Sequence, residues 1–336
     1  MAFISLLWGC DSSAAQTGGN TETPDRPWAT GPIIADHTVV SRYDQIPRFW
    51  IDQVKTMLLN VPGQSHATAY IYGLELLELQ DPTYAVSATW EGPPEGATDQ
   101  HLRVLRTFYE PLRWMQSAGE EHFWTNAEAV ETMKGHLNHM TEQGTPAHGF
   151  GFGWCWDMTW RNGPTETKDA IHGIGWAGSS EGGPSGNKAW GLDREDHDIT
   201  GNDVSMETYL EAVAAYNSAV PTTVTFFTTG PVDGERGTES GYQRFIKHEA
   251  IRTHVIETGG VLFDYADILC WNDDAEQHLD QWEGQTFQNG HPTLATGGTG
   301  YDGGRGGSHI SEAGCLRLGK ALWWMMARVA GWDGES

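Results

Sequence analysis

The chain has 336 residues, a formal net charge of −25 and a hydrophobic content of 38%. This charge argues against a nucleic-acid partner, because phosphate binding requires clustered lysine and arginine, and it argues equally against docking on anionic lipid. The 42 glycines and 16 tryptophans indicate many loops and aromatic-lined surfaces. A neutral substrate, such as a sugar or its ester, suits such a surface. The alternative is that the acidity serves solubility alone.

Residues 1–27 are typical of a signal segment followed by a polar tether. The apolar run FISLLWGC ends in Leu7, Trp8, Gly9 and Cys10, which resembles a bacterial lipobox whose cysteine is lipidated after cleavage. The polar residues that follow have the composition of a flexible linker. No other stretch approaches the roughly 18 apolar residues of a transmembrane helix. We therefore expect an exported protein, a bacterial lipoprotein of the periplasm or cell surface, whose membrane contact is a lipid anchor at Cys10.

From residue 28 onward, segments typical of strands alternate with segments typical of helices. We expect strands near residues 56–61, 84–90, 149–156, 222–228 and 260–265. We expect helices over residues 47–54, from 66 to about 79, from about 99, and over 126–143, 205–220, 242–260 and 308–331. Residues 161–203, rich in Gly, Trp and Asp, are expected to form an ordered insertion. This alternation predicts a single α/β domain, residues 28–336, with a parallel sheet covered on both faces.

A serine stands where the first predicted strand gives way to a helix. The apolar run ends in Pro62 and Gly63, and Gln64, Ser65 and His66 precede the helical pattern. Serine is a good helix cap, so a structural role is one interpretation. The other is a nucleophile at the carboxyl end of a strand, beside amides that stabilise an oxyanion. Ligands bind beyond the carboxyl ends of parallel strands, and five residues follow such ends: Ser65, Gly96, Asp157, Gly230 and Asp267.

His309 is the candidate base for this serine. It lies in the segment GGRGGSHISEAG, where a glycine-rich loop meets the start of the terminal helix. Glycines allow such a loop to approach the open end of the sheet closely. The alternative is a structural histidine beside a helix cap, either Ser308 or Ser311.

Taken in order, these motifs resemble those of the SGNH/GDSL hydrolases. The segment NVPGQSHATAY resembles the first block of that superfamily, with Ser65 in the place of the nucleophile and Gln64 where aspartate is usual. The segment GPPEGATDQHLRVL resembles the second block, whose key glycine falls on Gly96. The segment GFGWCWDM lies where the third block is expected, with Asp157 in its last position and Trp156 in place of the asparagine. The resemblance implies a flavodoxin-like three-layer α/β/α sandwich with a central parallel sheet of about five strands.

The resemblance also implies a serine esterase that needs no metal or organic cofactor. Ser65, deprotonated by His309, would attack an ester carbonyl and form an acyl-enzyme. The amides of Ser65 and Gly96 would hold the oxyanion. Asn162 is a candidate to replace the missing asparagine.

The acid that orients the histidine is the point at which the chain departs most from this resemblance. The last block of the superfamily has an aspartate three residues before the histidine, and Gly306 occupies that place before His309. We take Asp302, in the same loop, as the orienting acid. Asp157 and Asp267 are the alternatives, and a serine–histidine dyad is a third.

The expected substrate is a neutral small-molecule or polysaccharide ester, such as an acyl group on a carbohydrate. Tryptophans crowd the third strand and the insertion, where they form a sugar-stacking wall or fill the core: Trp154, Trp156, Trp160, Trp176 and Trp190. We assign Trp154, Trp156, Asp157 and Trp160 to substrate binding. The alternative is a non-catalytic carbohydrate-binding surface lipoprotein that retains the fold, which the missing asparagine and the displaced acid favour.

The cysteine pattern and the acidic stretch 192–203 give no metal site. Cys155, Cys270 and Cys315 are odd in number and lack metal-site spacing, which leaves room for one disulfide and one free thiol. The acidic stretch is oxygen-rich like a calcium loop but lacks EF-hand spacing, so a solvated turn is the simpler interpretation.

Overall fold

The computed structural model describes residues 31–115, 119–158, 165–178, 189–234 and 236–335. The predicted signal segment and Cys10 lie outside these residues, and so do Trp160 and Asn162. Within the described part of the chain, no helix combines the length and the apolarity needed to cross a membrane.

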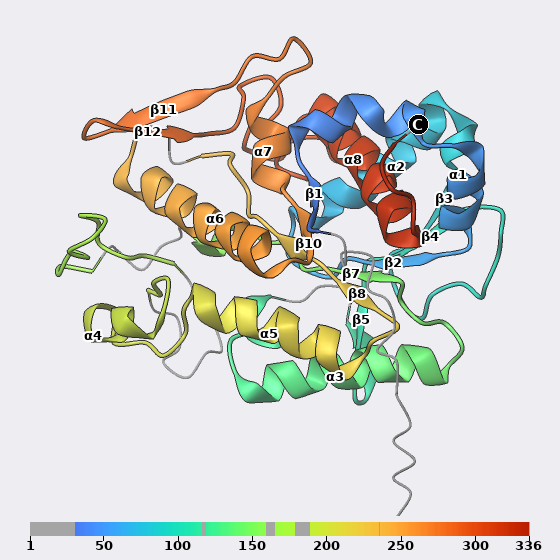
Figure 1. Cartoon of the computed structure of the whole chain (residues 1–336), viewed down its shortest axis with the longest axis horizontal. Coiled ribbons are helices and arrows are strands. Elements are labelled where there is room, and N and C mark those ends of the chain that lie inside the picture. The colour runs from blue at the N-terminus through green and yellow to red at the C-terminus, as the bar shows by residue number, and fades with distance from the viewer. Residues whose placement is uncertain (1–30, 116–118, 159–164, 179–188, 235, 336) are drawn as a thin grey trace, which may run out of the picture.

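A parallel sheet occupies the centre of the molecule (Figure 1). Its strands lie in the order β3 (Val86–Thr89), β4 (Leu102–Leu105), β2 (Leu58–Asn60), β7 (Gly149–Phe150) and β8 (Val224–Thr225). One residue after β8 the chain enters β9 (Phe227–Thr228), which pairs in parallel with β10 (Val261–Phe263), and β10 pairs with β1 (Ile33–Ala35). Residues 224–228 therefore join the five-stranded sheet to a three-stranded one. All five predicted strands are found.

Helices cover the sheet on both faces. One layer contains the 3-10 segment η1 (His37–Gln45), α1 (Arg48–Lys55), α2 (Ala67–Gln80) and α8 (Glu312–Ala330), and the other contains α3 (Ala127–Glu142), α5 (Met206–Ala219) and α6 (Glu239–Thr258) (Figure 1). Neighbouring strand residues alternate between two cores: Leu59 packs with the first layer and Leu58 with the second. Because both faces of the sheet are buried, the sequences of its strands are nearly continuous apolar runs. The fold is the predicted three-layer α/β/α sandwich.

The segment after β3 differs from the prediction. We expected a helix from about Asp99, but the chain forms strand β4 and then a hairpin of β5 (Phe108–Glu110) and β6 (Arg113–Met115). The four residues of β4 are all buried and lie between β3 and β2, so pairing on both edges outweighs their helical pattern.

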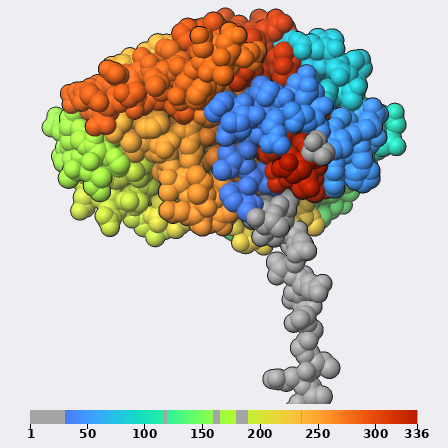
Figure 2. Space-filling model, turned by 45° about the horizontal axis from the view of Figure 1, so that its top comes forward, coloured from blue at the N-terminus to red at the C-terminus, as the bar shows by residue number. Residues whose placement is uncertain are grey.

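The remaining elements are short and lie around the sheet. They are η2 (Pro82–Tyr84), η3 (Glu120–His122), η4 (Trp156–Met158), η5 (Arg194–Asp196), α4 (His197–Thr200), α7 (Tyr265–Cys270), and the hairpin of β11 (Leu279–Trp282) and β12 (Gln285–Gln288). This hairpin packs along α6. Figure 2 shows the segment of η1 and α1, in blue, beside α8, in red. The three cysteines that the structure describes, Cys155, Cys270 and Cys315, are free thiols.

A buried lysine ties the described parts of the insertion to α6. Nζ of Lys247 donates to the carbonyl oxygens of Met158 and Ala177, both at 2.8 Å. It also lies 3.7 Å from the centre of the Trp190 ring. Burial lowers the pKa of this amine well below its ordinary value. Because a buried amine needs hydrogen-bond partners, Lys247 holds segments on either side of residues 179–188 against the body of the domain.

Helices α2 and α8 approach each other through glycines. A Cβ atom on Gly73 of α2 would lie 2.0 Å from the carbonyl oxygen of Cys315, and one on Gly319 of α8 would lie 2.2 Å from the carbonyl oxygen of Gly73. The backbones are therefore in direct contact at this crossing. Both helices begin at the carboxyl edge of the sheet, so the crossing fixes the distance between their first turns.

We expect Gly319→Ala to destabilise the fold by about 1–3 kcal/mol, because the added methyl group meets backbone that cannot yield easily. The matched control is Gly135→Ala in α3, where a Cβ atom meets nothing within 4 Å. That change should be neutral or stabilise by up to about 1 kcal/mol through helix propensity. Urea unfolding of the two variants checks this, and equal stabilities would contradict the close crossing.

Candidate active site

The turn that carries Ser65 is an extension of β2. Gly63 pairs with Gly153 of the neighbouring chain segment, and the Gln64 amide donates to the Gly153 carbonyl oxygen at 3.0 Å. Gly63 has a φ of +148°, and a Cβ atom there would lie 2.1 Å from that same oxygen. Only glycine fits this position. Ser65 follows directly, at the tip of the strand and before the first turn of α2.

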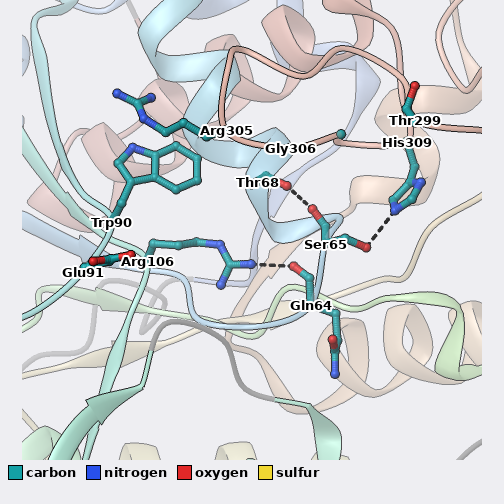
Figure 3. Close-up of a pocket in the computed structure, with 11 residues that line it drawn as sticks. Gln64, Ser65, Thr68, Trp90, Glu91, Arg106, Thr299, Arg305, Gly306 and His309 are labelled. Atoms are coloured by element: carbon teal, nitrogen blue, oxygen red, sulfur yellow. Dashed lines mark hydrogen bonds between the residues drawn. The ribbon is translucent and has the colours of Figure 1, made fainter.

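Arg106 holds this turn from the side of β4. Its guanidinium donates to the carbonyl oxygen of Gly63 at 2.9 Å. It also donates to that of Gln64 at 2.6 Å (Figure 3). The side chain is buried, and burial lowers its pKa to about 10, so it remains a cation at neutral pH. Sequence reasoning missed Arg106, because the segment was expected to be helical. The alternating apolar residues Leu102 and Val104 were the signal that places it at the carboxyl end of a strand.

His309 reaches Ser65 from the glycine-rich loop before α8. The Ser65 hydroxyl and His309 Nε2 are 2.8 Å apart (Figure 3). The His309 amide donates to the Thr299 carbonyl oxygen at 3.1 Å, and the Gly297 amide donates to the His309 carbonyl oxygen at 3.0 Å. His309 has a φ of 64°, a left-handed conformation that is unfavourable for a residue other than glycine. The structure thus brings together the two residues predicted to be nucleophile and base.

A main-chain carbonyl takes the place of the orienting acid. His309 Nδ1 donates to the Gly298 carbonyl oxygen at 2.5 Å. The Asp302 carboxylate instead accepts the Gly304 amide at 2.8 Å, and the Asp302 carbonyl oxygen accepts the Tyr72 hydroxyl. The assignment of Asp302 as the orienting acid is therefore wrong in this structure. Because a carbonyl oxygen only accepts, the proton is on Nδ1, and Nε2 is left to accept the hydroxyl proton of Ser65.

The two alternative acids are also engaged elsewhere. Asp157 accepts the Cys155 amide at 3.2 Å and bonds to Glu120, and burial raises the pKa of Glu120 to about 10 and that of Asp157 to about 6. Asp267 bonds to His37 through both the main-chain amide and the ring. Neither carboxyl group is a partner of His309, and Asp157 is placed in a carboxyl pair rather than at a substrate surface.

A second histidine lies against the first. The rings of His66 and His309 have centroids 4.5 Å apart, and His66 Nε2 bonds to the Asp233 carboxylate at 2.8 Å. Burial lowers the pKa of His66, but the Asp233 carboxylate outweighs it and the pKa rises to about 9. Burial lowers the pKa of His309, and the His66 imidazolium lowers it further. At neutral pH His66 is therefore charged and His309 is neutral, as a base must be.

The serine and the histidine open into a cavity of about 910 Å³. Trp90, Glu91 and Arg305 line its outer part. The Arg305 guanidinium lies 4.7 Å from the centre of the Trp90 ring and pairs with Glu75 at 3.1 Å. Thr68 lines the cavity near the serine. The cavity has the size of a small-ligand site and combines one aromatic ring with several polar groups.

The predicted second oxyanion residue is not in this cavity. Gly96 is exposed and has open space around it. Its neighbour Glu95 accepts a hydrogen bond from Arg103, which also donates to Thr56 at the amino end of β2. Gly96 therefore lies away from Ser65, which sits at the opposite end of the strand. The cause is the missed strand β4, which follows Gly96 and moves the carboxyl edge to Arg106.

The amides at the start of α2 are the available oxyanion donors. In the described part of the chain, the amides of Ser65 and His66 donate to no acceptor, whereas that of Ala67 is bonded to the Gln64 carbonyl oxygen. They lie at the amino end of a 14-residue helix. The helix dipole favours negative charge at that end.

The tryptophans divide between the core and the site. Trp154, Trp176 and Trp190 are fully buried, so the interpretation of these three as a sugar-stacking wall is wrong. Trp154 donates from its ring to the Thr228 carbonyl oxygen at 2.9 Å. Trp156 packs on His309 with ring centroids 4.5 Å apart.

One group of metal-ligand type occurs among the described residues, and it does not include Ser65 or His309. Ligand atoms of Asp36, His37 and Asp267 lie within 4.8 Å of one another. An Asp36 oxygen caps the Thr38 amide at 2.9 Å, and Asp267 bonds to His37. Because His37 and Asp267 are paired with each other and Asp36 caps a turn, these contacts account for the group and we assign no metal to it.

Comparison with known proteins gives no family assignment. No protein-family model matches the chain, and no curated protein matches it. The function must therefore be argued from the motifs and from the geometry of the site.

We expect Asp302→Asn to change the rate of reaction of Ser65 with a fluorophosphonate by no more than about twofold, because this carboxylate only accepts a local amide. Removing a genuine orienting acid would slow the reaction far more, by up to about 10⁴-fold. Labelling kinetics of the two proteins, followed by intact mass, make the comparison. A loss of tenfold or more would show that Asp302 reaches the imidazole in solution.

Proposed function

We propose that the chain is a serine hydrolase of the SGNH type that cleaves carboxylic esters. The observation that carries this proposal is the 2.8 Å contact between the Ser65 hydroxyl and a neutral His309 at the carboxyl edge of a parallel sheet. If Ser65 were only a helix cap, its hydroxyl would accept a hydrogen bond from a backbone amide of α2. Here it points to an imidazole whose other nitrogen is held by a carbonyl oxygen, which is the arrangement that activates a nucleophile.

In the proposed reaction, His309 Nε2 takes the proton of the Ser65 hydroxyl as the oxygen attacks the ester carbonyl. The amides of Ser65 and His66 donate to the oxyanion that forms. The His309 imidazolium then returns its proton to the leaving alcohol, and the ester C–O bond breaks to give an acyl-enzyme. Water, deprotonated by the same nitrogen, releases the acid and restores Ser65.

The lining of the cavity favours an ester on a carbohydrate. Its volume of about 910 Å³ admits more than a simple acyl chain. Hydroxyl groups of Thr68 and Thr299 and the charged groups of Glu91 and Arg305 line the cavity, and such groups bond sugar hydroxyls. We propose an acylated saccharide as the substrate, met outside the cytoplasm by a lipoprotein anchored at Cys10.

We expect the wild-type chain to react with a fluorophosphonate at Ser65 and to hydrolyse p-nitrophenyl acetate and acetylated glycans. Ser65→Ala and His309→Ala should each lower the hydrolysis rate by roughly 10³-fold or more. The control is Ser218→Ala on the exposed side of α5, which should keep full activity.

Glycan binding without labelling or hydrolysis would replace this proposal with the non-catalytic carbohydrate-binding function. That outcome is accessible to calorimetry with the same glycans.

The fall of kcat/KM at low pH, the acid limb of the pH profile, should report the protonation of His309. We expect kcat/KM to fall as the pH drops through a value below 6.5, because the lowered pKa keeps the ring neutral until then. His66→Gln removes a neighbouring positive charge and leaves the Asp233 carboxylate, so the limb should move up by on the order of one pH unit. His101→Gln, remote from the cavity, is the control. A limb that does not move would mean that His66 does not tune the base.

A further inference from the structure

A free thiol lies beside the Ser65 hydroxyl. Cys155 follows the segment that pairs with the serine turn, and its sulfur is 3.6 Å from Ser65 Oγ. It is partly exposed, whereas Cys270 and Cys315 are buried. The serine reaction described above does not use this thiol.

The thiol has its own imidazole and carboxylate. His66 is 1% exposed, and Asp233, which holds its Nε2 at 2.8 Å, is 5% exposed. The Cys155 thiol lies close enough to this ring to raise its pKa, and the ring of the next residue, Trp156, meets it edge-on with centroids 5.0 Å apart. The other ring nitrogen, Nδ1, is buried and has no hydrogen-bond partner among the described residues. A sulfur, an imidazole with an unpaired nitrogen and a carboxylate thus lie together, and these are the groups that activate a cysteine nucleophile.

The His66–Asp233 pair supplies a proton donor beside the sulfur. The Asp233 carboxylate keeps His66 protonated at neutral pH, so the imidazolium can protonate the group that leaves when the sulfur attacks. The other two thiols are held in the protonated form, because burial raises the pKa of Cys315 to about 12 and also raises the pKa of Cys270. Reactivity should therefore be confined to Cys155 among these three.

We propose that Cys155, with His66 and Asp233, is a second nucleophile beside Ser65 and a site of covalent modification by peroxides and soft alkylating agents. With hydrogen peroxide, the thiolate sulfur attacks one oxygen: an S–O bond forms, the O–O bond breaks, and the leaving hydroxide takes a proton from His66 to give water. The sulfur is oxidised to sulfenic acid and the peroxide is reduced. With iodoacetamide, an S–C bond forms and iodide leaves.

Modification of this sulfur stops the serine reaction. An atom added to a sulfur 3.6 Å from Ser65 Oγ enters the space in which an ester carbonyl must lie. A sulfenic acid also competes with His309 for the serine hydroxyl. The cavity would then be open under reducing conditions and closed under oxidising ones. This consequence rests on the proposed function, whereas the reactivity of the thiol does not.

Alkylation of the full chain tests the thiol directly. The chain is treated with iodoacetamide at about pH 6, where an ordinary thiol is almost entirely protonated, and each cysteine is followed by peptide mass. We expect Cys155 to react at least about tenfold faster than Cys270 and Cys315, and faster than the same cysteine in chain unfolded by urea. A rate no higher than that in the unfolded chain would overturn the proposal, and this comparison needs no variant.

Variants identify the cause of the reactivity. His66→Gln and Asp233→Asn should each slow alkylation of Cys155 by about tenfold, whereas His101→Gln should not change it. Circular dichroism shows whether each variant is folded. A folded His66→Gln protein that reacts at the wild-type rate would contradict the role of the imidazole.

Treatment with peroxide tests whether modification of the Cys155 thiol blocks the reaction of Ser65. Treated wild-type protein should lose fluorophosphonate labelling at Ser65 and regain it with dithiothreitol, while Cys155→Ala should label with or without peroxide. Equal loss in wild type and Cys155→Ala would overturn the regulatory part of the proposal. A chain that alkylates rapidly at Cys155 but never labels at Ser65 would reject the esterase and leave the reactive thiol standing.

Discussion

The direct contact between the backbones of α2 and α8 is the constraint on which the site depends. Gly73 and Gly319 leave no room for a side chain on either helix at the crossing. Ser65 precedes the first helix and His309 precedes the second, and the two residues are 244 positions apart in the chain. A wider helix separation would part them by more than a hydrogen bond tolerates. Packing between the two helices therefore determines whether the hydroxyl meets the imidazole.

Main-chain groups perform much of the positioning that side chains usually perform. The Gly298 carbonyl oxygen fixes the His309 tautomer. The carbonyl oxygens of Gly63 and Gln64 accept the hydrogen bonds by which Arg106 holds the serine turn. Such contacts are fixed by backbone path alone. They explain how the site can be ordered although the chain lacks the acidic residue and the asparagine that its motifs would lead one to expect.

Regular elements were predictable where the apolar pattern was long or continuous. The buried strands follow from such patterns. The approach of His309 to Ser65 was predicted from the glycine-rich segment before it. Four residues are too few to predict strand β4, because its pairing with β3 and β2 decides whether the segment is a strand or a helix. Gly96 was misassigned as a result. No sequence pattern identifies the partner of His309, since every residue carries a carbonyl group. Nor does composition tell a tryptophan that fills a core, such as Trp154, from one that lines a surface.

The carbonyl partner of His309 changes the charge balance of the proposed reaction. With a carboxylate in that place, the imidazolium, the oxyanion and the carboxylate sum to one negative charge. Here, while Cys155 is a neutral thiol, the imidazolium and the oxyanion cancel and the His66–Asp233 pair adds nothing to the total. The charge that remains beside the serine turn is the Arg106 cation, which is neutralised by no step of the reaction. The transition state is then an internal dipole rather than a buried anion, and its solvation in a partly enclosed cavity requires fewer polar groups. Such a centre should depend little on ionic strength, even within a chain as acidic as this one.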